Sequence, residues 1–278
     1  TGALQVFRKE QDAIPDALTR EIHAQHDINI EMLSADELYQ LEPGLSREFK
    51  AATFHPDTGV VATSIALSEA YAGQFLARGG KFIRERVRRF DIGERGPRIA
   101  VTDLGMHKLE HLVIAAGAWS GQLARMLGTK VSLDTERGYH VNVAWTDEVT
   151  LNRPVFDSRY YNYIVPMRDG VRITSGAEIG GLELPPDFTR IRRVLKRARQ
   201  TVKGLSGEVT REWMGYRPST HDSKPVIDRS TRYDNVFFAF GHGHAGLSQS
   251  AVTALLLSDL IARRTPRIDL TPFAATRF

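Results

Sequence analysis

The last part of the chain places an apolar strand, a glycine-rich turn and an apolar helix in direct succession. Residues 236–240 form a continuous apolar run, three glycines lie among the next six residues, and a helix is expected over residues 247–263. That helix is apolar on nearly every side, so we expect it to be buried. Glycines let a backbone approach a ligand closely, and the amides at a helix start favour an anion or developing negative charge. The segment therefore predicts a turn that binds a ligand. The alternative is a glycine-rich turn between strand and helix that has no ligand.

A second strand runs into a turn and a helix in the same way. Leu112–Ala116 is apolar throughout, Gly117 follows, and residues 119–127 read as helical. Continuous apolar strands are typical of parallel sheets covered on both faces, and ligands of such sheets bind beyond the carboxyl ends of the strands. The small residues at this strand end leave room for a large ligand. A glycine that only packs a helix is an equally good interpretation.

Arg217 is the residue best suited to bind a carboxylate. It stands between Tyr216 and Pro218, which predicts a constrained loop. A guanidinium group held in this way can grip a carboxylate through two parallel hydrogen bonds. The alternative is a surface arginine without a ligand, which is the commoner fate of an arginine.

Two histidines, His242 and His244, lie within the glycine-rich turn. Alternate residues of an extended segment can face one metal ion. No carboxylate or third histidine lies close to them in the sequence, so we expect no metal site.

The middle of the chain has a different character, because short strand-like stretches follow one another there. Strands are expected over residues 139–145, 160–166 and 171–175, with a basic helix over residues 190–203 packed on them. Around this insert we expect helices over residues 34–42, 64–77 and 119–127, and strands over residues 4–7, 81–85, 87–92, 98–103 and 112–116. The fold class is therefore α/β with a mostly antiparallel α+β insert, arranged as two interleaved domains.

Composition limits the chemistry of the chain. Its 278 residues include no cysteine, which excludes disulfides, thiolate nucleophiles and cysteine zinc sites. The net charge of +4 is concentrated in the basic helix, where seven basic residues and no acidic one lie between Arg190 and Lys203. No aromatic residues interleave with these charges for base stacking, so we expect a solvated face and no nucleic acid. A peripheral contact with an anionic membrane remains open.

Further motifs occur in a fixed order along the chain. They are Thr1-Gly2-Ala3-Leu4-Gln5, His55-Pro56-Asp57-Thr58-Gly59-Val60-Val61, Arg137-Gly138-Tyr139, and Tyr163-Ile164-Val165-Pro166-Met167-Arg168-Asp169-Gly170. Together with the three segments above, they resemble the D-amino-acid oxidase superfamily of FAD-dependent oxidoreductases. The branch they resemble most comprises bacterial D-amino-acid dehydrogenases and glycine/sarcosine oxidase-like enzymes.

The resemblance implies a set of site residues. For FAD they are Val87 at the adenine, Ala116, Gly117 and Trp119 along the cofactor path, and Gly241, His242, Gly243, Gly246, Leu247 and Ser248 at the isoalloxazine ring. For the substrate they are Arg217, which would bind the carboxylate, Tyr163, which would assist it, and His244 as a further contact.

The superfamily begins with a strand-Gly-x-Gly-x-x-Gly-helix unit that grips the ADP half of FAD, and this chain contains none. The chain opens within a strand-like run, so we expect it to be a fragment of a longer protein. We expect residues 1–55 and 129–213 to form the substrate domain. Residues 56–128 and 214–278 should then form the remaining part of the Rossmann-like FAD domain.

The resemblance implies oxidation of the CH–NH bond of an amino acid, with a D-amino acid foremost, by hydride transfer to FAD. The alternatives are a sarcosine-, glycine- or proline-type amine oxidase, and a non-catalytic fragment unable to hold FAD. The electron acceptor is left open between oxygen, quinone and a partner protein, and a second subunit is a further expected partner. The expected location is the cytoplasm or the inner face of the cell membrane.

Overall fold

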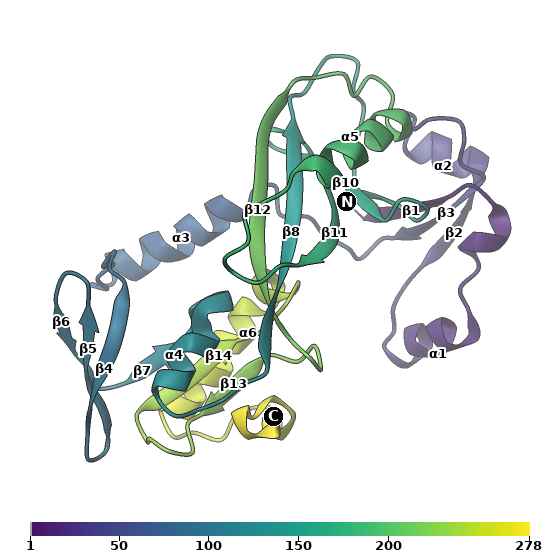
Figure 1. Ribbon diagram of the computed structural model, residues 1–278. Coiled ribbons are helices and arrows are strands. Elements are labelled where there is room, and N and C mark those ends of the chain that lie inside the picture. The colour runs from purple at the N-terminus through teal and green to yellow at the C-terminus, as the bar shows by residue number, and fades with distance from the viewer. Residues whose placement is uncertain (1) are drawn as a thin grey trace. The chain divides into compact units, whose positions relative to one another are not determined.

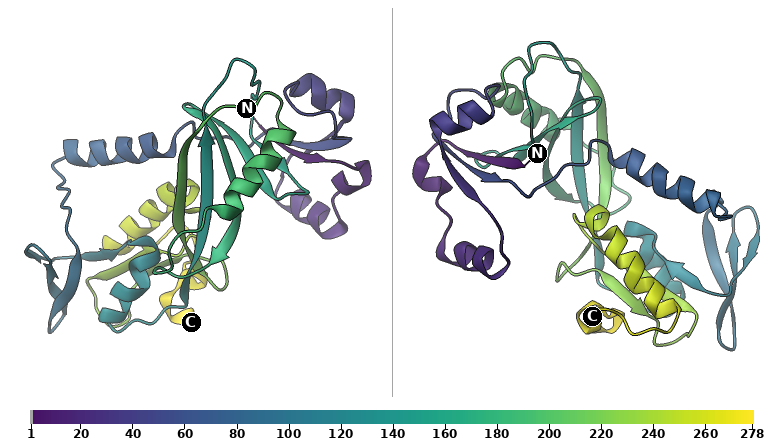
Figure 2. Two further views of the ribbon diagram at one scale, coloured as in Figure 1. Left: turned by 45° about the horizontal axis from the view of Figure 1, so that its top comes forward. Right: turned by 180° about the vertical axis from the view of Figure 1, so that it is seen from behind.

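A computed structural model describes residues 2–278, so Thr1 of the first motif lies outside the described residues. The polypeptide divides into two compact units that interleave along the sequence (Figures 1 and 2). Unit 1 comprises the residues up to Ser68 together with residues 138–177 and 185–215, and unit 2 comprises residues 69–137, 178–184 and 216–278. The mixed α/β class that the sequence predicts is confirmed.

Most of an eight-stranded sheet belongs to unit 1, while residues 133–137 and 216–220, at the ends of two of its strands, belong to unit 2. In spatial order its strands are β12 (Val209–Thr220), β8 (Leu133–Val143), β11 (Gly170–Ile179), β10 (Asn162–Met167), β9 (Val155–Asp157), β1 (Ala3–Phe7), β3 (Ala51–His55) and β2 (Glu31–Ser34). The hairpin of β10 and β11 is antiparallel, while β1 and β9 pair in parallel. The predicted antiparallel character of this insert is thus confirmed for most of the sheet.

Helices cover one face of this sheet. The basic helix α5 (Thr189–Thr201) packs beside β10, as Figure 1 shows, and its apolar side is buried at Ile191, Leu195 and Ala198. These residues join alternate strand side chains, such as Ile164 and Ile173, in one hydrophobic core. The predicted amphipathic helix is therefore confirmed, with its basic residues on the solvated side.

Shorter helices complete unit 1. They are the 3-10 helix η1 (Glu10–Ala13), α1 (Ala17–Gln25) and α2 (Ala35–Leu41). The start of α2 has the predicted capping box, since the Ser34 hydroxyl accepts from the Glu37 amide and the Glu37 carboxylate accepts from the Ser34 amide.

Unit 2 contains two three-stranded sheets. The first has the order β13 (Val226–Arg229), β14 (Val236–Phe240) and β7 (Leu112–Ile114), and β14 runs parallel to β7 as their apolar sequences predict. Figure 1 shows α4 (Ser120–Met126) on one face of this sheet, and the view from behind in Figure 2 shows α6 (Gly246–Ile261) on the other. The second sheet is the meander β4 (Val87–Gly93), β5 (Gly96–Thr102) and β6 (Met106–Lys108). Three short 3-10 helices, η2 (Gly117–Trp119), η3 (Thr271–Phe273) and η4 (Ala275–Arg277), complete the unit.

Two local predictions are wrong. Residues 81–85 form no strand, because within the described part of the chain no other strand pairs with them. The helix α6 is not buried as a whole, since only Thr253, Leu256 and Asp259 are buried along it. Its inner side packs on β13 and β14, and its other apolar side chains, Leu247 and Leu255 among them, stay exposed.

The helix α3 (Ser64–Ala77) has no buried residue. Within residues 2–278, no helix combines the length and apolar character that crossing a bilayer requires.

Candidate active site in unit 2

The glycine-rich turn joins β14 to α6 in a conformation that depends on two of its glycines. Gly241 has φ +84° and Gly243 has φ +51°, values in the left-handed region that side chains with a Cβ rarely adopt. Beyond the turn, no side chain in the described residues caps the first turn of α6. The opening amides of this helix are therefore available to an acceptor that comes from outside the chain.

Arg217 lies beside this turn, on strand β12. The amide of Gly243 donates to the carbonyl oxygen of Pro218 at 2.9 Å, and Ser219 forms a β-bridge with His242. The prediction of a constrained loop around Arg217 is wrong, because residues 209–220 form one continuous strand. Backbone pairing in that strand fixes the position of the guanidinium-bearing residue more firmly than a loop would.

Two opposing effects act on the pKa of Arg217. Partial burial lowers the pKa of its guanidinium group, and the nearby Glu136 carboxylate acts in the opposite direction. The same carboxylate lies 3.1 Å from Nε2 of His244, through its Oε2 atom. Arg217, Glu136 and His244 thus come together from β12, β8 and the glycine-rich turn, three segments that are far apart in the sequence.

A cavity of 420 Å³ in unit 2 collects three of the predicted cofactor residues. Val87, Ala116 and Trp119 line it, together with residues 85, 86, 88, 122, 123 and 126. Trp119 also packs edge-on against Tyr216, with ring centroids 5.3 Å apart. The wall of the cavity is therefore in contact with the immediate neighbour of Arg217.

The backbone next to this cavity has space for a bulky ligand. Gly117 has φ +54°, and a Cβ built on it would meet nothing within 4 Å. At the glycine-rich turn, a Cβ built on Gly243 would meet only the Ser219 hydroxyl oxygen, at 3.7 Å. The open position at Gly117 beside this cavity, the open position at Gly243 and the uncapped start of α6 fit an elongated cofactor with an anionic or electron-rich end.

Tyr163, the remaining predicted substrate residue, lies in unit 1 on β10. Its ring stacks on Phe156 with a centroid distance of 4.5 Å, and its side chain is 49% exposed. Its role in binding the substrate stays a prediction.

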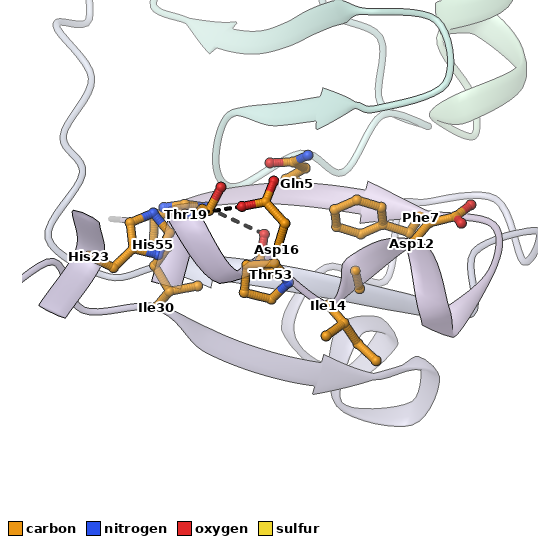
Figure 3. Close-up of a pocket in the computed structure, with 12 residues that line it drawn as sticks. Gln5, Phe7, Asp12, Ile14, Asp16, Thr19, His23, Ile30, Thr53 and His55 are labelled. Carbon is orange, nitrogen blue, oxygen red and sulfur yellow. Dashed lines mark hydrogen bonds between the residues drawn. The ribbon is translucent and has the colours of Figure 1, made fainter. Parts of the chain in front are cut away.

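Unit 1 has a cavity of its own, of 330 Å³, between β1, β3 and the segment that contains η1 and α1. The side chains of His23 and His55 lie side by side at one end of it, and Phe7 lies at the other (Figure 3). Burial, followed by the charge of His23, lowers the pKa of His55. None of the predicted site residues lines this cavity, so the candidate site is the one in unit 2.

The two histidines of the turn bond to different groups. Nε2 of His242 lies 3.0 Å from the Thr253 hydroxyl oxygen, whereas His244 faces Glu136. Within residues 2–278, no three histidine, aspartate or glutamate side chains are grouped to hold a metal ion. The absence of a metal site stays a prediction.

Glu136 is the residue that reasoning from the sequence missed. The motif Arg137-Gly138-Tyr139 begins immediately after it, and a Glu-Arg pair inside an otherwise strand-like run was an available sign of a polar site. Only the tertiary structure shows that its carboxylate reaches His244, 108 residues further along the chain.

Comparison with known proteins places this architecture in a family. The family model described as FAD dependent oxidoreductase matches residues 1–260. The chain is 31% identical over 250 residues to D-amino-acid oxidase of Bradyrhizobium diazoefficiens, covering 88% of this chain and 59% of that protein. It is 30% identical to D-amino acid dehydrogenase 2 of Mesorhizobium japonicum, covering 96% of this chain and 66% of that protein.

Among solved structures, glycine oxidase from Geobacillus kaustophilus superposes with a TM-score of 0.89 at 26% identity. The match covers 100% of this chain and 75% of that one. The chain thus spans less than two thirds of the length of the two curated relatives above, at 59% and 66%. FAD, the cofactor that the sequence predicts, is the cofactor that the family match indicates. By this match over most of its length, the chain belongs to the family of FAD-dependent oxidoreductases.

Proposed function

We propose that the complete protein oxidises the CH–NH bond of an amino acid, with a D-amino acid as the preferred substrate. The product is an imine, which water then hydrolyses to a keto acid. The observation that carries this proposal is the position of Arg217, half-buried and tied through Pro218 and Gly243 to the glycine-rich turn. A guanidinium group beside a cofactor cradle is suited to hold a substrate carboxylate at the reacting centre.

The proposed cofactor contacts divide between two ends of unit 2. Val87, Ala116, Gly117 and Trp119 would hold FAD along the cavity, which three of them line. The turn residues Gly241, His242, Gly243, Gly246, Leu247 and Ser248 would hold the ring end, where the helix amides favour negative charge. When bound, FAD accepts the hydride that leaves the substrate Cα.

The two units would accordingly have different roles in binding the cofactor and the substrate. We expect unit 2, with residues 69–137, 178–184 and 216–278, to provide the flavin-binding part predicted for residues 56–128 and 214–278. Unit 1 would then provide the substrate part predicted for residues 1–55 and 129–213. Tyr163 would assist Arg217 at the carboxylate, as the family resemblance implies. The contribution of these side chains is orientation and charge, because holding the reacting atoms in place removes much of the entropic barrier.

The test is reduction of the flavin in the full-length protein under anaerobic conditions. D-amino acids, glycine, sarcosine and L-proline are supplied one at a time, and loss of flavin absorbance is followed. We expect D-amino acids to reduce the flavin fastest and to yield the matching keto acid. Glycine belongs in the panel because glycine oxidases are among the similar proteins. In a sequence alignment over 258 residues, the enzyme of Geobacillus kaustophilus is 31% identical to this chain. If none of these amines reduces the flavin, the proposal is wrong.

Oxygen and a soluble quinone are then compared as electron acceptors with the best substrate. Faster turnover with one of them identifies the acceptor class.

A further inference from the structure

Glu136 has no part in the proposed function, yet it interacts with two of the predicted substrate residues, Arg217 and His244. Its Oε2 atom is 3.1 Å from Nε2 of His244, and its charge raises the pKa of Arg217 against the lowering effect of burial. A carboxylate beside a carboxylate-binding guanidinium group weakens that group's attraction for any second anion. A site that served only to bind a substrate carboxylate would bind it more weakly with Glu136 in this position.

We infer that Glu136 and His244 receive the ammonium group of the substrate and remove one proton from it, an inference that rests on the proposed oxidation of an amino acid. An α-amino acid at neutral pH carries a carboxylate and an ammonium group on the same carbon atom. Arg217 and Glu136 present the opposite pair of charges within one site. The side chains therefore match a zwitterion and not a simple carboxylic acid.

The proton has to leave before oxidation because the imine forms from the lone pair of a neutral amine. A hydrogen bond from Nε2–H of His244 to Glu136 selects the tautomer in which Nδ1 has a free lone pair. One ammonium proton passes to Nδ1, and the electron pair of the broken N–H bond stays on the substrate nitrogen. The resulting imidazolium faces the Glu136 carboxylate, which stabilises its charge as the carboxylates of other His–carboxylate pairs do. No oxidant is needed for this step.

Other charged groups surround the pair. Arg217, from β12, is the guanidinium group whose pKa responds to Glu136. Arg137 follows Glu136 on β8, so its side chain points to the opposite face of the strand, where its Nε lies 3.4 Å from Glu178. His242, two residues before His244, bonds to Thr253 and has a pKa lowered by burial. His244 is therefore the imidazole that faces the Glu136 carboxylate, and Arg217 is the guanidinium group that interacts with the same carboxylate.

The kinetic test measures the rate of anaerobic flavin reduction against pH in full-length holoenzyme, at saturating substrate. In His244→Asn and Glu136→Gln we expect the rate at neutral pH to fall about 100-fold, the effect of losing a positioned base. The rate of both variants should rise again as the pH passes the pKa of the substrate ammonium itself, because the amine then arrives already neutral. A pH profile identical to that of the wild-type enzyme in both variants would overturn the inference.

The binding test uses a zwitterion that cannot be oxidised. The compound 2-aminoisobutyrate has no Cα–H, and isobutyrate is its counterpart without the amine. Calorimetry on the wild-type protein should show tighter binding of the amino compound, and Glu136→Gln should weaken that preference roughly 10-fold, the contribution of a charged hydrogen bond. Equal preference in the two proteins would contradict the ammonium contact.

We expect both variants to fold, since the side chains of His244 and Glu136 are 65% and 33% exposed. The matched control is His107→Asn, which removes the histidine of another His–Glu pair, 2.8 Å from Glu85. This control should leave both the pH profile and the binding preference unchanged. If no amine reduces the wild-type flavin, the proposed function fails, while the calorimetric comparison still decides whether Glu136 receives an ammonium group.

Discussion

The backbone amide of Gly243 donates a hydrogen bond of 2.9 Å to the carbonyl oxygen of Pro218. This bond ties the turn that begins α6 to the strand that carries Arg217, and the bridge between Ser219 and His242 lies beside it. Because the contact is between backbones, substitution of a neighbouring side chain changes the chemistry of the site with little effect on its geometry. The site can therefore be probed one side chain at a time.

Replacing Arg217 with Ala in the full-length enzyme should reduce kcat/KM for an amino-acid substrate. The substitution removes a half-buried guanidinium group that would pair with a carboxylate, a loss worth about 2–5 kcal/mol. Lysine at this position should restore only part of the activity, because its ammonium group cannot form the two parallel bonds of a guanidinium group. Steady-state kinetics and the Kd of a simple carboxylate inhibitor measure both effects.

Arg229→Ala is the control for this substitution, since Arg229 belongs to the same unit and its side chain is 45% exposed. It should leave kcat/KM unchanged. An Arg217→Ala enzyme that binds the carboxylate as tightly as the wild type would show that another residue holds this group.

Replacing Gly117 with Val should lower the amount of FAD bound by the full-length protein. The new side chain would enter open space beside Ala116 and Trp119, which line the proposed cofactor cavity. The positive φ of Gly117 adds a backbone cost of about 1–2 kcal/mol. The ratio of flavin to protein absorbance and the melting temperature with and without added FAD are the measurements.

The variant Gly79→Val separates the loss of cofactor binding from the backbone cost of a positive φ. Gly79 also has a positive φ, of +87°, and open space around a built Cβ, but it lies outside the cavity lining. Both variants should lose similar stability, and only Gly117→Val should lose flavin. Equal flavin content in the two variants would argue against a cofactor path along Gly117.

His140 should make the stability of the protein depend on pH between 6.5 and about 4. Burial, and then the charges of Arg172 and Arg211, lower the pKa of His140 from 6.5 to about 4. In this range the unfolded chain binds a proton that the folded protein excludes, so stability is complete above pH 6.5 and falls as the pH drops toward 4. We expect a loss of about 1–2 kcal/mol after allowing for partial exposure.

Urea unfolding of the wild type and of His140→Gln at pH 7.5, 6.5, 5.5 and 4.5 measures this contribution. The glutamine variant should show a flatter dependence on pH in this range, while acidic residues produce the same background loss in both proteins. If the free energy of unfolding depends on pH equally in the two proteins, protonation of His140 does not destabilise the folded state.

Several elements followed from local sequence alone. Alternating residues and the turn at Arg168-Asp169 specify the hairpin of β10 and β11, and the pair Ser34 and Glu37 specifies the start of α2. These structures depend on interactions between residues that are close in the chain, so a short stretch contains all the information for them. The order of the motifs was sufficient to predict the family as well.

Other features depended on which distant segments meet. Residues 81–85 have the composition of a strand but find no partner within the described chain, and the apolar α6 buries only the side that β13 and β14 cover. A strand forms only where a second strand pairs with it, and a side chain is buried only where another element covers it. The sequence of one segment describes neither the pairing strand nor the covering element.

The sequence by itself determined the strand-turn-helix units, the antiparallel insert, the family, and the identity of Arg217 and His244 as candidate site residues. Only the tertiary structure decided that Arg217 lies on a strand and that Glu136 interacts with Arg217 and His244. A carboxylate acquires its role from the groups it faces, and those groups lie on β12 and on the turn before α6. Contacts between residues so far apart in the chain are set by the packing of the whole unit, which no local pattern encodes.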